Sequence, residues 1–433
     1  MDEQTNLVPE WMEGKKVNES LFCREYLQKH PMIAISGTFF TVDGRVNDEA
    51  KLMRDILEKI EPYVTSGLSR KVQNLLDALR LMCYSDPLPV ETDRIHVANG
   101  TLFLDGTFRE EKVFCMNRLP VAYNPAAPVP EKWFAFLQEL LYPEDIPTLQ
   151  EYMGYCLIPS NKGQTMLFLI GNGGEGKSRI GLVMRSLLGT NMSTGSIAKV
   201  ETSPFARADL EHRLVMVDDD MKLEALPQTN HLKTIVTAEM EMDLEKKGEQ
   251  SYQGMLYARL MAFGNGALRA LYDHSDGFYR RQLILSAKPK DKARWDDPFI
   301  AEKLCSEAEG IFLWAVEGLK RLIQNGYHFT KSERTQANIE ASMREGNNVL
   351  DFMDSEGYFL FKADDWITSK DFYEVYVMWC DDNAEKPLVR KTFINYLRSK
   401  EQKYNLEYNN YGHNREGRRV WGFLGIRNLV KIF

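Results

Sequence analysis

The sequence lacks the features that mark secreted and membrane proteins. Its six cysteines lie far apart and form no Cys-x-x-Cys pair, so neither a disulfide framework nor a thiolate zinc site is indicated. No apolar run approaches the roughly 20 residues that a helix needs to span a bilayer, and the acidic start Met1 to Gln4 is unlike a signal peptide. Internal repeats and low-complexity tracts are absent as well. These absences predict a cytoplasmic protein without membrane contact, and its 433 residues suffice for about three domains.

Two neighbouring stretches near the end of the chain differ in charge: the first has few basic residues and the second has few acidic residues. The whole chain has a formal net charge of −8, which argues against an even coat of nucleic acid. Residues 351–385 hold ten Asp and Glu against two Lys, whereas residues 386–433 hold eleven Lys and Arg against three Glu. The basic end suits a phosphate partner, but an ordinary solvated surface has the same composition. Charge alone leaves both interpretations open.

One glycine-rich stretch points to a nucleotide. An apolar run, Met166 to Ile170, leads into Gly171-Asn172-Gly173-Gly174-Glu175-Gly176-Lys177-Ser178, and a helical pattern follows from Arg179 to Leu188. Strand, Gly-x-x-x-x-Gly-Lys-Ser and helix together form a Walker A pattern. Its glycines let backbone N–H groups face the β- and γ-phosphates at the positive end of the helix. Lys177 adds a charge on the phosphates and Ser178 offers a hydroxyl to Mg²⁺, so ATP and Mg²⁺ are the predicted cofactors.

Acidic and amide side chains follow two later apolar runs. Leu214 to Val217 ends in Asp218-Asp219-Asp220, a Walker B candidate, because sites on open α/β sheets form at the carboxyl ends of strands. We expect Asp218 to hold Mg²⁺ through water and Asp219 to orient the attacking water, although the triplet leaves the register open by one residue. An acidic surface turn is the alternative. Asn265 ends the run Leu260 to Gly264 and suits a γ-phosphate contact, although a turn is the commoner place for an asparagine.

Two adjacent arginines precede another predicted strand. Arg280 and Arg281 stand just before the run Gln282 to Ser286. A guanidinium at a subunit edge can act on the nucleotide of a neighbouring subunit, because its planar fork matches the charge that develops on the transferred phosphoryl group. We therefore interpret the pair as containing an arginine finger. An ordinary ion-paired arginine is the alternative for each of them.

The remaining patterns outline the other predicted elements. Asn-Gly and Asp-Gly pairs between alternating apolar residues predict hairpins at Ile35 to Gly44 and Ile95 to Gly106. Strands that alternate with helices from about 164 to 290 predict a parallel sheet with helices on its faces. Further expectations are helix from Glu131 to Tyr155 with a break near Pro143 and Pro147, helix from Glu302 to Asn325, a polar linker from Thr330 to Asn348, helices at Phe372 to Cys380 and Arg390 to Lys403, and two strands within Asn405 to Ile426.

The order of these motifs resembles that of superfamily 3 helicases, in particular the poxvirus-type and phage or plasmid primase-helicase family. The resemblance rests on Walker A, the carboxylates, Lys233 to Glu239, Asn265 and the arginine pair, and it extends over most of the chain. It implies an AAA+ ATPase that works as a homo-oligomeric ring, usually a hexamer, on single- and double-stranded DNA. Other replication proteins are candidate partners.

The same resemblance implies a DNA-contacting hairpin in the channel of the ring. The segment Asp243 to Gln253 lies between the carboxylates and Asn265, where the family carries that hairpin, and it offers Lys246 or Lys247 as the contact. A solvated hairpin without a partner is the alternative.

The resemblance also implies a fold class and a domain order. We expect an α/β protein: an α+β, mostly helical domain over residues 1–160, an AAA+ P-loop core with a parallel sheet over 161–329, a linker over 330–349, and a winged-helix DNA-binding domain over 350–433. In that last domain, Arg390 and Lys391 begin a predicted recognition helix with one apolar face. Arg418 and Arg419, after the turn Gly412 to Gly417, suit a wing. A protein-docking module of the same fold is the alternative.

Three departures from the family pattern bear on function. The family often has Glu where Asp219 stands, Asn265 is followed by Gly-Ala-Leu rather than a proline-containing turn, and the N-terminal residues leave no room for a primase catalytic domain. The sequence therefore predicts an ATP-dependent DNA helicase or replication initiator without priming activity, acting at an origin of a phage, plasmid or mobile island in a bacterial cell. An ATP-gated DNA-binding switch or loader that separates no strands is the alternative.

Overall fold

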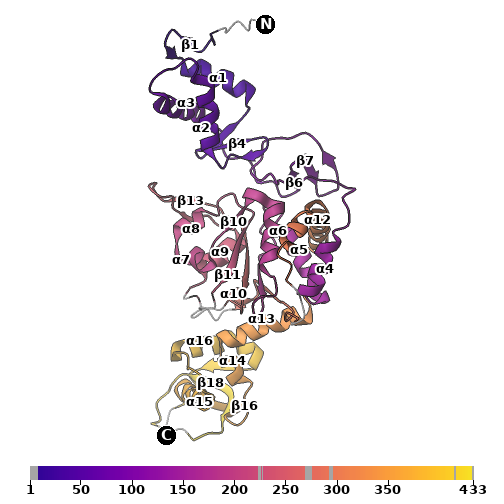
Figure 1. The fold of residues 1–433 in the computed structure, drawn as a ribbon. Helices are drawn as coiled ribbons and strands as arrows, with labels where there is room; N and C mark the ends of the chain where they lie inside the picture. The colour runs from indigo at the N-terminus through magenta and orange to yellow at the C-terminus, as the bar shows by residue number, and fades with distance from the viewer. Residues whose placement is uncertain are drawn as a thin grey trace.

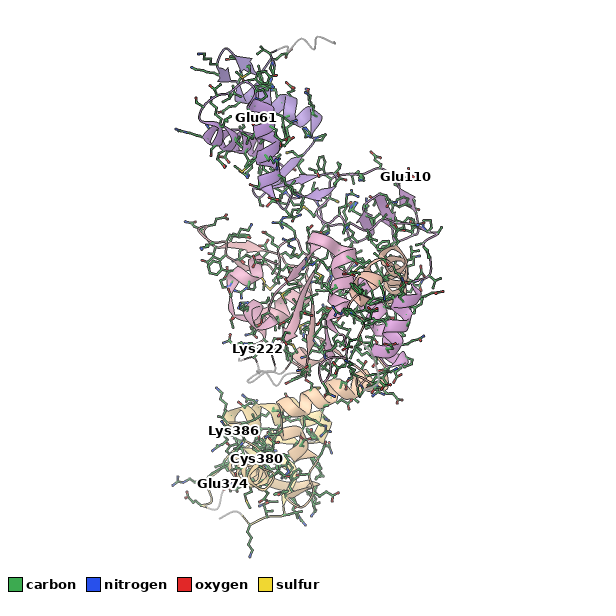
Figure 2. The ribbon with its side chains drawn as sticks, viewed as in Figure 1. Glu61, Glu110, Lys222, Glu374, Cys380 and Lys386 are labelled. Carbon is green, nitrogen blue, oxygen red and sulfur yellow. The ribbon has the colours of Figure 1, made fainter. Side chains whose placement is uncertain are left out.

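The computed structural model of the chain describes residues 8–222, 226, 228–268, 276–291, 296–413 and 416–431. Figure 1 shows three parts along one long axis: a helical N-terminal part, a central α/β body and a C-terminal part that contains the end of the chain. With side chains drawn in Figure 2, Glu61 marks the N-terminal part and Cys380 the C-terminal part. No helix among the described residues is long and apolar enough to cross a membrane.

The N-terminal part has a hydrophobic core of its own, built from residues between Trp11 and Cys83. Polar caps begin two of its helices, because Asn18 accepts a hydrogen bond from the Leu21 N–H and Asp48 accepts one from the Ala50 N–H. Its antiparallel sheet β3-β4-β5 confirms the first predicted hairpin. The elements are β1 (Met12–Glu13), β2 (Lys16–Val17), α1 (Glu19–Lys29), β3 (Ile33–Ile35), β4 (Thr38–Thr41), β5 (Gly44–Arg45), α2 (Glu49–Ile60) and α3 (Leu68–Met82).

The hydrophobic cores divide the chain before residue 95 rather than at residue 160. Ile95, Leu137 and Tyr152 share one core cluster with Leu167 of the central sheet, because helices α4 and α5 bury their apolar faces in the central body. The predicted boundary therefore falls inside a continuous core. The second predicted hairpin and the helix broken near Pro143 are confirmed. The elements are β6 (Arg94–Val97), β7 (Gly100–Phe103), β8 (Phe108–Arg109), α4 (Glu131–Leu140), the short 3₁₀ helix η1 (Pro143–Asp145) and α5 (Ile146–Tyr155).

A five-stranded sheet with only parallel pairs forms the centre of the body, in the order β10-β11-β14-β9-β15. Its strands are β9 (Met166–Ile170), β10 (Met192–Thr194), β11 (Val215–Met221), β14 (Arg259–Gly264) and β15 (Gln282–Ser286). Leu167 and Leu169 belong to the core on one face, whereas Met166 and Phe168 belong to the core on the other. Burial on both faces explains the continuous apolar runs in the sequence, and the predicted α/β fold is confirmed.

Helices cover both faces of this sheet. On one side α5 and α12 approach very closely, since a Cβ on Gly154 would lie 2.2 Å from the carbonyl oxygen of Ala315. Only glycine fits at that crossing. The helices and the remaining strands are α6 (Ser178–Leu188), η2 (Gly189–Asn191), α7 (Ile197–Thr202), α8 (Pro204–Ala208), α9 (Asn230–Thr237), β12 (Met242–Leu244), β13 (Tyr252–Gly254), α10 (Asp276–Tyr279), α11 (Ile300–Cys305) and α12 (Ala308–Gln324).

The segment predicted as a polar linker forms a helix, α13 (Glu333–Gly346). Ser332 caps it by accepting a hydrogen bond from the Thr335 N–H. Asn338 Nδ2 donates to the Ile284 carbonyl oxygen of β15 at 2.8 Å, and Ile339 is buried beside the sheet. The linker prediction is therefore corrected to a docked helix. Its polar composition concealed it, because only a narrow apolar stripe faces the core.

The C-terminal part has a separate aromatic core around Phe352, Phe372 and Phe393. Its antiparallel sheet has the order β16-β18-β17. The predicted helices and the two late strands are present, whereas β16 was missed because most of its side chains are exposed or half-buried. Residues 414 and 415 of the predicted turn lie outside the described residues. The elements are α14 (Val349–Met353), β16 (Phe359–Thr368), α15 (Ser369–Asp382), α16 (Arg390–Ser399), α17 (Glu401–Tyr404), β17 (Glu407–Asn409) and β18 (Gly422–Asn428).

Candidate functional site

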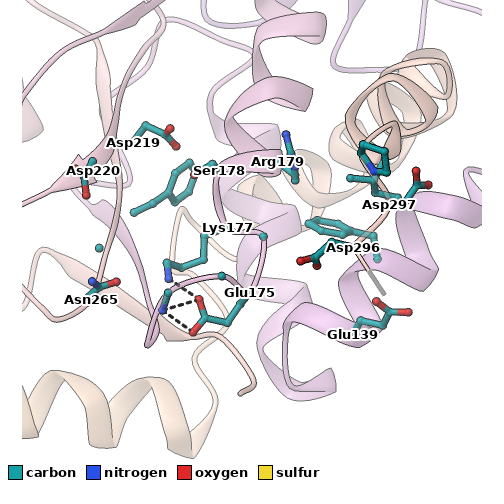
Figure 3. Close-up of a pocket in the computed structure, with 18 of the residues that line it drawn as sticks. Glu139, Glu175, Lys177, Ser178, Arg179, Asp219, Asp220, Asn265, Asp296 and Asp297 are labelled. Carbon is teal, nitrogen blue, oxygen red and sulfur yellow. Dashed lines mark hydrogen bonds and ion pairs between the residues drawn. The ribbon is translucent and has the colours of Figure 1, made fainter. Parts of the chain in front are cut away.

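A cleft of about 920 Å³ opens where the neighbouring strands β9, β14 and β11 end. Parallel strands bring their carboxyl ends to one edge of the sheet, so the segments that follow them meet there. The cleft is lined by the loop after β9, by Asp219 and Asp220 of β11, and by Asn265 after β14 (Figure 3). These groups, distant in sequence, were each singled out by the sequence analysis.

The loop after β9 depends on glycine for its shape. Gly173, Gly174 and Gly176 have φ angles of 103°, 81° and 104°, in the left-handed region that other residues rarely adopt. The loop leads directly into α6, whose first residue, Ser178, is exposed in the cleft. The amino end of an eleven-residue helix, which is the positive end of its dipole, therefore lies at the cleft.

Glu175 forms an ion pair with Lys177, the basic side chain of this loop. Its carboxylate accepts hydrogen bonds from the Lys177 ammonium at 2.8 Å and from the Gly173 N–H at 2.9 Å, and it also accepts one from the Asn172 N–H. Both side chains are buried. Burial alone would raise the pKa of the Glu175 carboxyl, but the hydrogen bond and charge of Lys177 hold that pKa below its ordinary value. Figure 3 shows the contacts of Glu175 with Lys177 and Gly173.

The three consecutive aspartates of β11 have different surroundings. Asp219 and Asp220 are exposed and line the cleft. Asp218 is buried and does not line it; its Oδ2 accepts a hydrogen bond from the Ile197 N–H at 2.8 Å. Burial raises the pKa of the Asp218 carboxyl. Asp218 therefore binds the first backbone N–H of α7, whereas the carboxylates of Asp219 and Asp220 face the cleft.

Asn265 is exposed at the end of β14 and faces the glycine loop. Its Oδ1 lies 4.0 Å from the position of a Cβ built on Gly173. The adjacent backbone joins the two strand ends, because the Gly171 N–H donates to the Gly264 carbonyl oxygen at 3.1 Å. Asn265 therefore sits where a ligand held by the loop would come within reach of its amide.

The residues that line the opposite wall of the cleft could not be recognised in the sequence. Glu139 of α4 lies there, together with Asp296 and Asp297 (Figure 3), and Lys132 and Phe136 of the same helix also line the cleft. In the sequence α4 reads only as an amphipathic helix, and no motif connects it with the glycine loop. Among the lining residues that the structure describes, carboxylates outnumber cationic side chains: there are six acids (Glu139, Glu175, Asp219, Asp220, Asp296, Asp297) and three bases (Lys132, Lys177, Arg179).

Arg280 and Arg281 lie away from this cleft within the same chain. They precede β15, whose first residue, Gln282, pairs with Met166 at the start of β9, whereas the glycine loop follows the end of β9. The length of a five-residue strand, roughly 16 Å, separates the two ends. Arg281 is half-buried and donates to the Gly277 carbonyl oxygen, whereas Arg280 is exposed.

The predicted hairpin is present as β12 and β13, and its two lysines differ. Figure 1 shows β13 at the rim of the central body beside α8. The Lys246 ammonium pairs with Glu211 at 2.9 Å and lies 5.0 Å from the centre of the Tyr252 ring. Lys247 is exposed at the turn, and no residue that the structure describes forms an ion pair with it. Of the two candidates, Lys247 is the one available to a ligand.

The basic side chains predicted on the C-terminal part are exposed. Arg390 and Lys391 begin α16, and Arg419 follows the turn. The Arg418 side chain is 80% exposed and lies 3.7 Å from Glu416. The structure thus leaves these four side chains exposed on the C-terminal part, whereas the cleft is lined by residues of the central body.

Comparisons with known proteins bear on the fold. A model described as a family of unknown function (DUF5906) matches residues 169–281. No curated protein is significantly similar to the chain. The A form apo structure of the NrS-1 C-terminal region has a TM-score of 0.52 at 13% identity and covers 93% of this chain and 98% of that chain. Another apo structure of that region has a TM-score of 0.53 at 12% identity and covers 96% and 100%. The chain therefore shares its fold with the NrS-1 C-terminal region.

Proposed function

We propose that the chain is an ATP-hydrolysing DNA helicase or replication initiator that acts as a ring on DNA. One observation carries the proposal: the glycine loop with Lys177 and Ser178, two carboxylates and Asn265 converge on a single cleft. A phosphate loop needs such partners to position a nucleotide and its attacking water. The order of the motifs, which resembles that of phage and plasmid primase-helicases, supports a replication role in a phage or mobile element.

The side chains of the cleft have separate roles in this proposal. The loop N–H groups and Lys177 hold the phosphates, and Asn265 contacts the γ-phosphate. Asp219 and Asp220 are the candidates for orienting water and for holding the cation, a role first expected of Asp218, whose carboxylate is engaged with α7. This acid-rich cleft would repel a bare polyphosphate, so a cation must enter with it.

The donors present fit Mg²⁺. Ser178 and the exposed carboxylates of Asp219 and Asp220 offer the oxygen ligands that this ion prefers, and phosphates and waters complete its shell. Bound there, Mg²⁺ would neutralise the charge of the phosphates.

Glu175→Gln is expected to tighten the binding of ADP and ATP by about tenfold. The ammonium of Lys177 is held by a buried carboxylate, and a nucleotide must draw it away; hydrogen bonds to charged groups contribute about 1.5–3 kcal/mol each. Glutamine keeps the shape and can still accept from the Asn172 and Gly173 N–H groups, but it has no charge to hold Lys177. Titration calorimetry with each nucleotide measures the change. Weaker binding would mean instead that Glu175 supports the loop and does not compete with phosphate.

The position of Arg280 supports action between subunits. It is exposed and about a strand's length from the cleft of its own chain, so it can reach a nucleotide only in a neighbouring subunit. We expect Arg280→Ala and Lys177→Ala to be inactive alone and to recover part of the ATP turnover when mixed. In a mixed ring, some interfaces pair an intact cleft with an intact arginine.

Steady-state ATPase assays over a range of mixing ratios measure this recovery. Arg281→Ala is the matched control, because Arg281 already binds backbone within its own chain. Absence of recovery, with ring assembly verified by light scattering, would contradict a role of Arg280 in trans.

A further inference from the structure

An exposed aromatic stack lies on the surface of the C-terminal part. The indole of Trp421 is 52% exposed and stacks on Tyr408, with ring centres 5.0 Å apart and planes 16° from parallel. The Arg398 guanidinium lies 5.0 Å from the centre of the Tyr408 ring. Arginine from α16, tyrosine from β17 and tryptophan before β18 thus form one group on a surface rather than in a core.

The backbone on both sides of this indole is held firmly. The carbonyl oxygen of Trp421 accepts a hydrogen bond from the Ser369 N–H at 2.9 Å. The next residue, Gly422, packs so closely on the Trp366 ring that a Cβ there would lie 2.4 Å from it. The ring of Trp421 is therefore presented in a fixed place, with Tyr408 against one side and solvent on another.

Exposed cations accompany the stack. Lys391 and Arg398 are exposed, together with Asn395, at spacings of four and three residues, so they share one face of α16. Arg418 and Arg419 are exposed and precede Trp421 by three and two residues. The acids nearby are already engaged in part: Glu416 lies beside Arg418, and Glu401 accepts a hydrogen bond from the Tyr408 N–H at 3.2 Å.

We propose that Trp421 stacks an unpaired base of single-stranded DNA next to a duplex that the surrounding cations hold. An exposed ring in a basic surface suits a nucleic acid, because every base offers a face for stacking while its phosphates meet arginine and lysine. Stacking tolerates any sequence, so this contact recognises the single strand rather than a base pair. The surface as a whole fits the junction of a fork, where both kinds of strand are present.

This inference rests on the proposed DNA-binding role and names the form of DNA that the tail selects. The test uses the full chain without nucleotide, so that its result does not depend on ATP hydrolysis. A labelled blunt duplex and the same duplex with a single-stranded thymidine extension are each titrated, and fluorescence anisotropy gives the two dissociation constants. The wild-type protein is expected to bind the extended duplex more tightly.

Trp421→Ala should weaken binding of the extended duplex by about tenfold and leave the blunt duplex nearly unchanged, because truncation removes one base-stacking contact. Trp421→Tyr should restore most of the affinity. Leu360→Ala is the matched control, since Leu360 is 53% exposed on β16 of the same part but, as an aliphatic side chain, offers no ring on which a base could stack. Arg418→Ala with Arg419→Ala should weaken the binding of both DNA ligands, and this effect should become smaller as the salt concentration rises.

Three results would overturn the proposal. The wild-type protein could show no preference for the extension, Trp421→Ala could weaken both ligands equally, or that variant could bind both normally. The last result, together with a loss of self-association in light scattering, would assign the stack to a contact between protein chains. ATP turnover by the same Trp421→Ala preparation shows whether the central body is intact, so failure of this inference is distinct from failure of the ATPase proposal.

Discussion

Lys177→Ala is expected to lower ATP turnover by at least about 10²-fold, the scale on which removal of a preorganised charge acts. Lys177 is the buried cation of the glycine loop, and its present partner, Glu175, is an anion like the phosphate that would replace it. A steady-state phosphate-release assay at saturating ATP and Mg²⁺ measures the loss.

The control for this variant is Lys320→Ala, which removes a lysine from the surface of the same body, where it pairs with Glu317. Asp219→Asn is a second probe, expected to bind ATP and fail to hydrolyse it. Turnover near the wild-type rate in Lys177→Ala, from protein free of other ATPases, would remove the ATPase assignment.

Lys247→Ala is expected to lower the rate at which a forked duplex is unwound by more than about tenfold, while ATP turnover without DNA stays close to normal. The exposed ammonium at the tip of the β12-β13 hairpin is available to a DNA phosphate and lies on a different element from the cleft residues. Loss of one phosphate contact should also reduce the slope of log affinity against log salt by about 0.7 for single-stranded DNA.

Lys246→Ala provides a comparison within the same hairpin. Lys246 is already engaged by Glu211 and the Tyr252 ring, so its loss should act through the stability of the hairpin. We expect it to weaken unwinding less than Lys247→Ala and to leave the salt dependence unchanged. Normal unwinding by Lys247→Ala would show that the hairpin does not move DNA.

The sequence was most informative where one local pattern specified both a conformation and a chemistry. The loop from Gly171 to Ser178 could be placed because its glycines adopt φ angles that few other residues tolerate, and because an apolar strand and a helix flank it. The runs that became β9, β14 and β15 were recognisable because strands buried on both faces are apolar throughout.

Side chains brought in by tertiary packing could not be found in this way. Glu139 of α4 lies across the cleft from the glycine loop, but nothing in its local sequence refers to that loop. The difference between Asp218 and Asp219 depends on which side of β11 faces α7. Likewise, the sequence does not distinguish Lys246 from Lys247, and only the ion pair with Glu211 shows that Lys246 is engaged.

The predicted domain boundary at residue 160 and the predicted linker differ from the observed packing for a related reason. Helix α13 has mostly polar residues, and Asn338 docks it on β15 through two hydrogen bonds, to Ile284 and Ser286, that no periodicity predicts. Helices α4 and α5 were assigned to the N-terminal part because they precede the glycine loop, yet they bury their apolar faces in the central core. Amphipathic patterns indicate that a face is buried, but they do not identify the element that covers it.

Strand separation tests the central proposal most directly. The measurement is the ATP-dependent release of a labelled strand from a forked duplex by the wild-type protein and by Lys177→Ala, with binding to the same fork monitored in parallel. We expect release by the wild-type protein only when ATP and Mg²⁺ are present, and none by Lys177→Ala, although both bind the fork. Nucleotide-dependent binding without release by the wild-type protein would contradict the helicase and leave an ATP-gated DNA-binding switch.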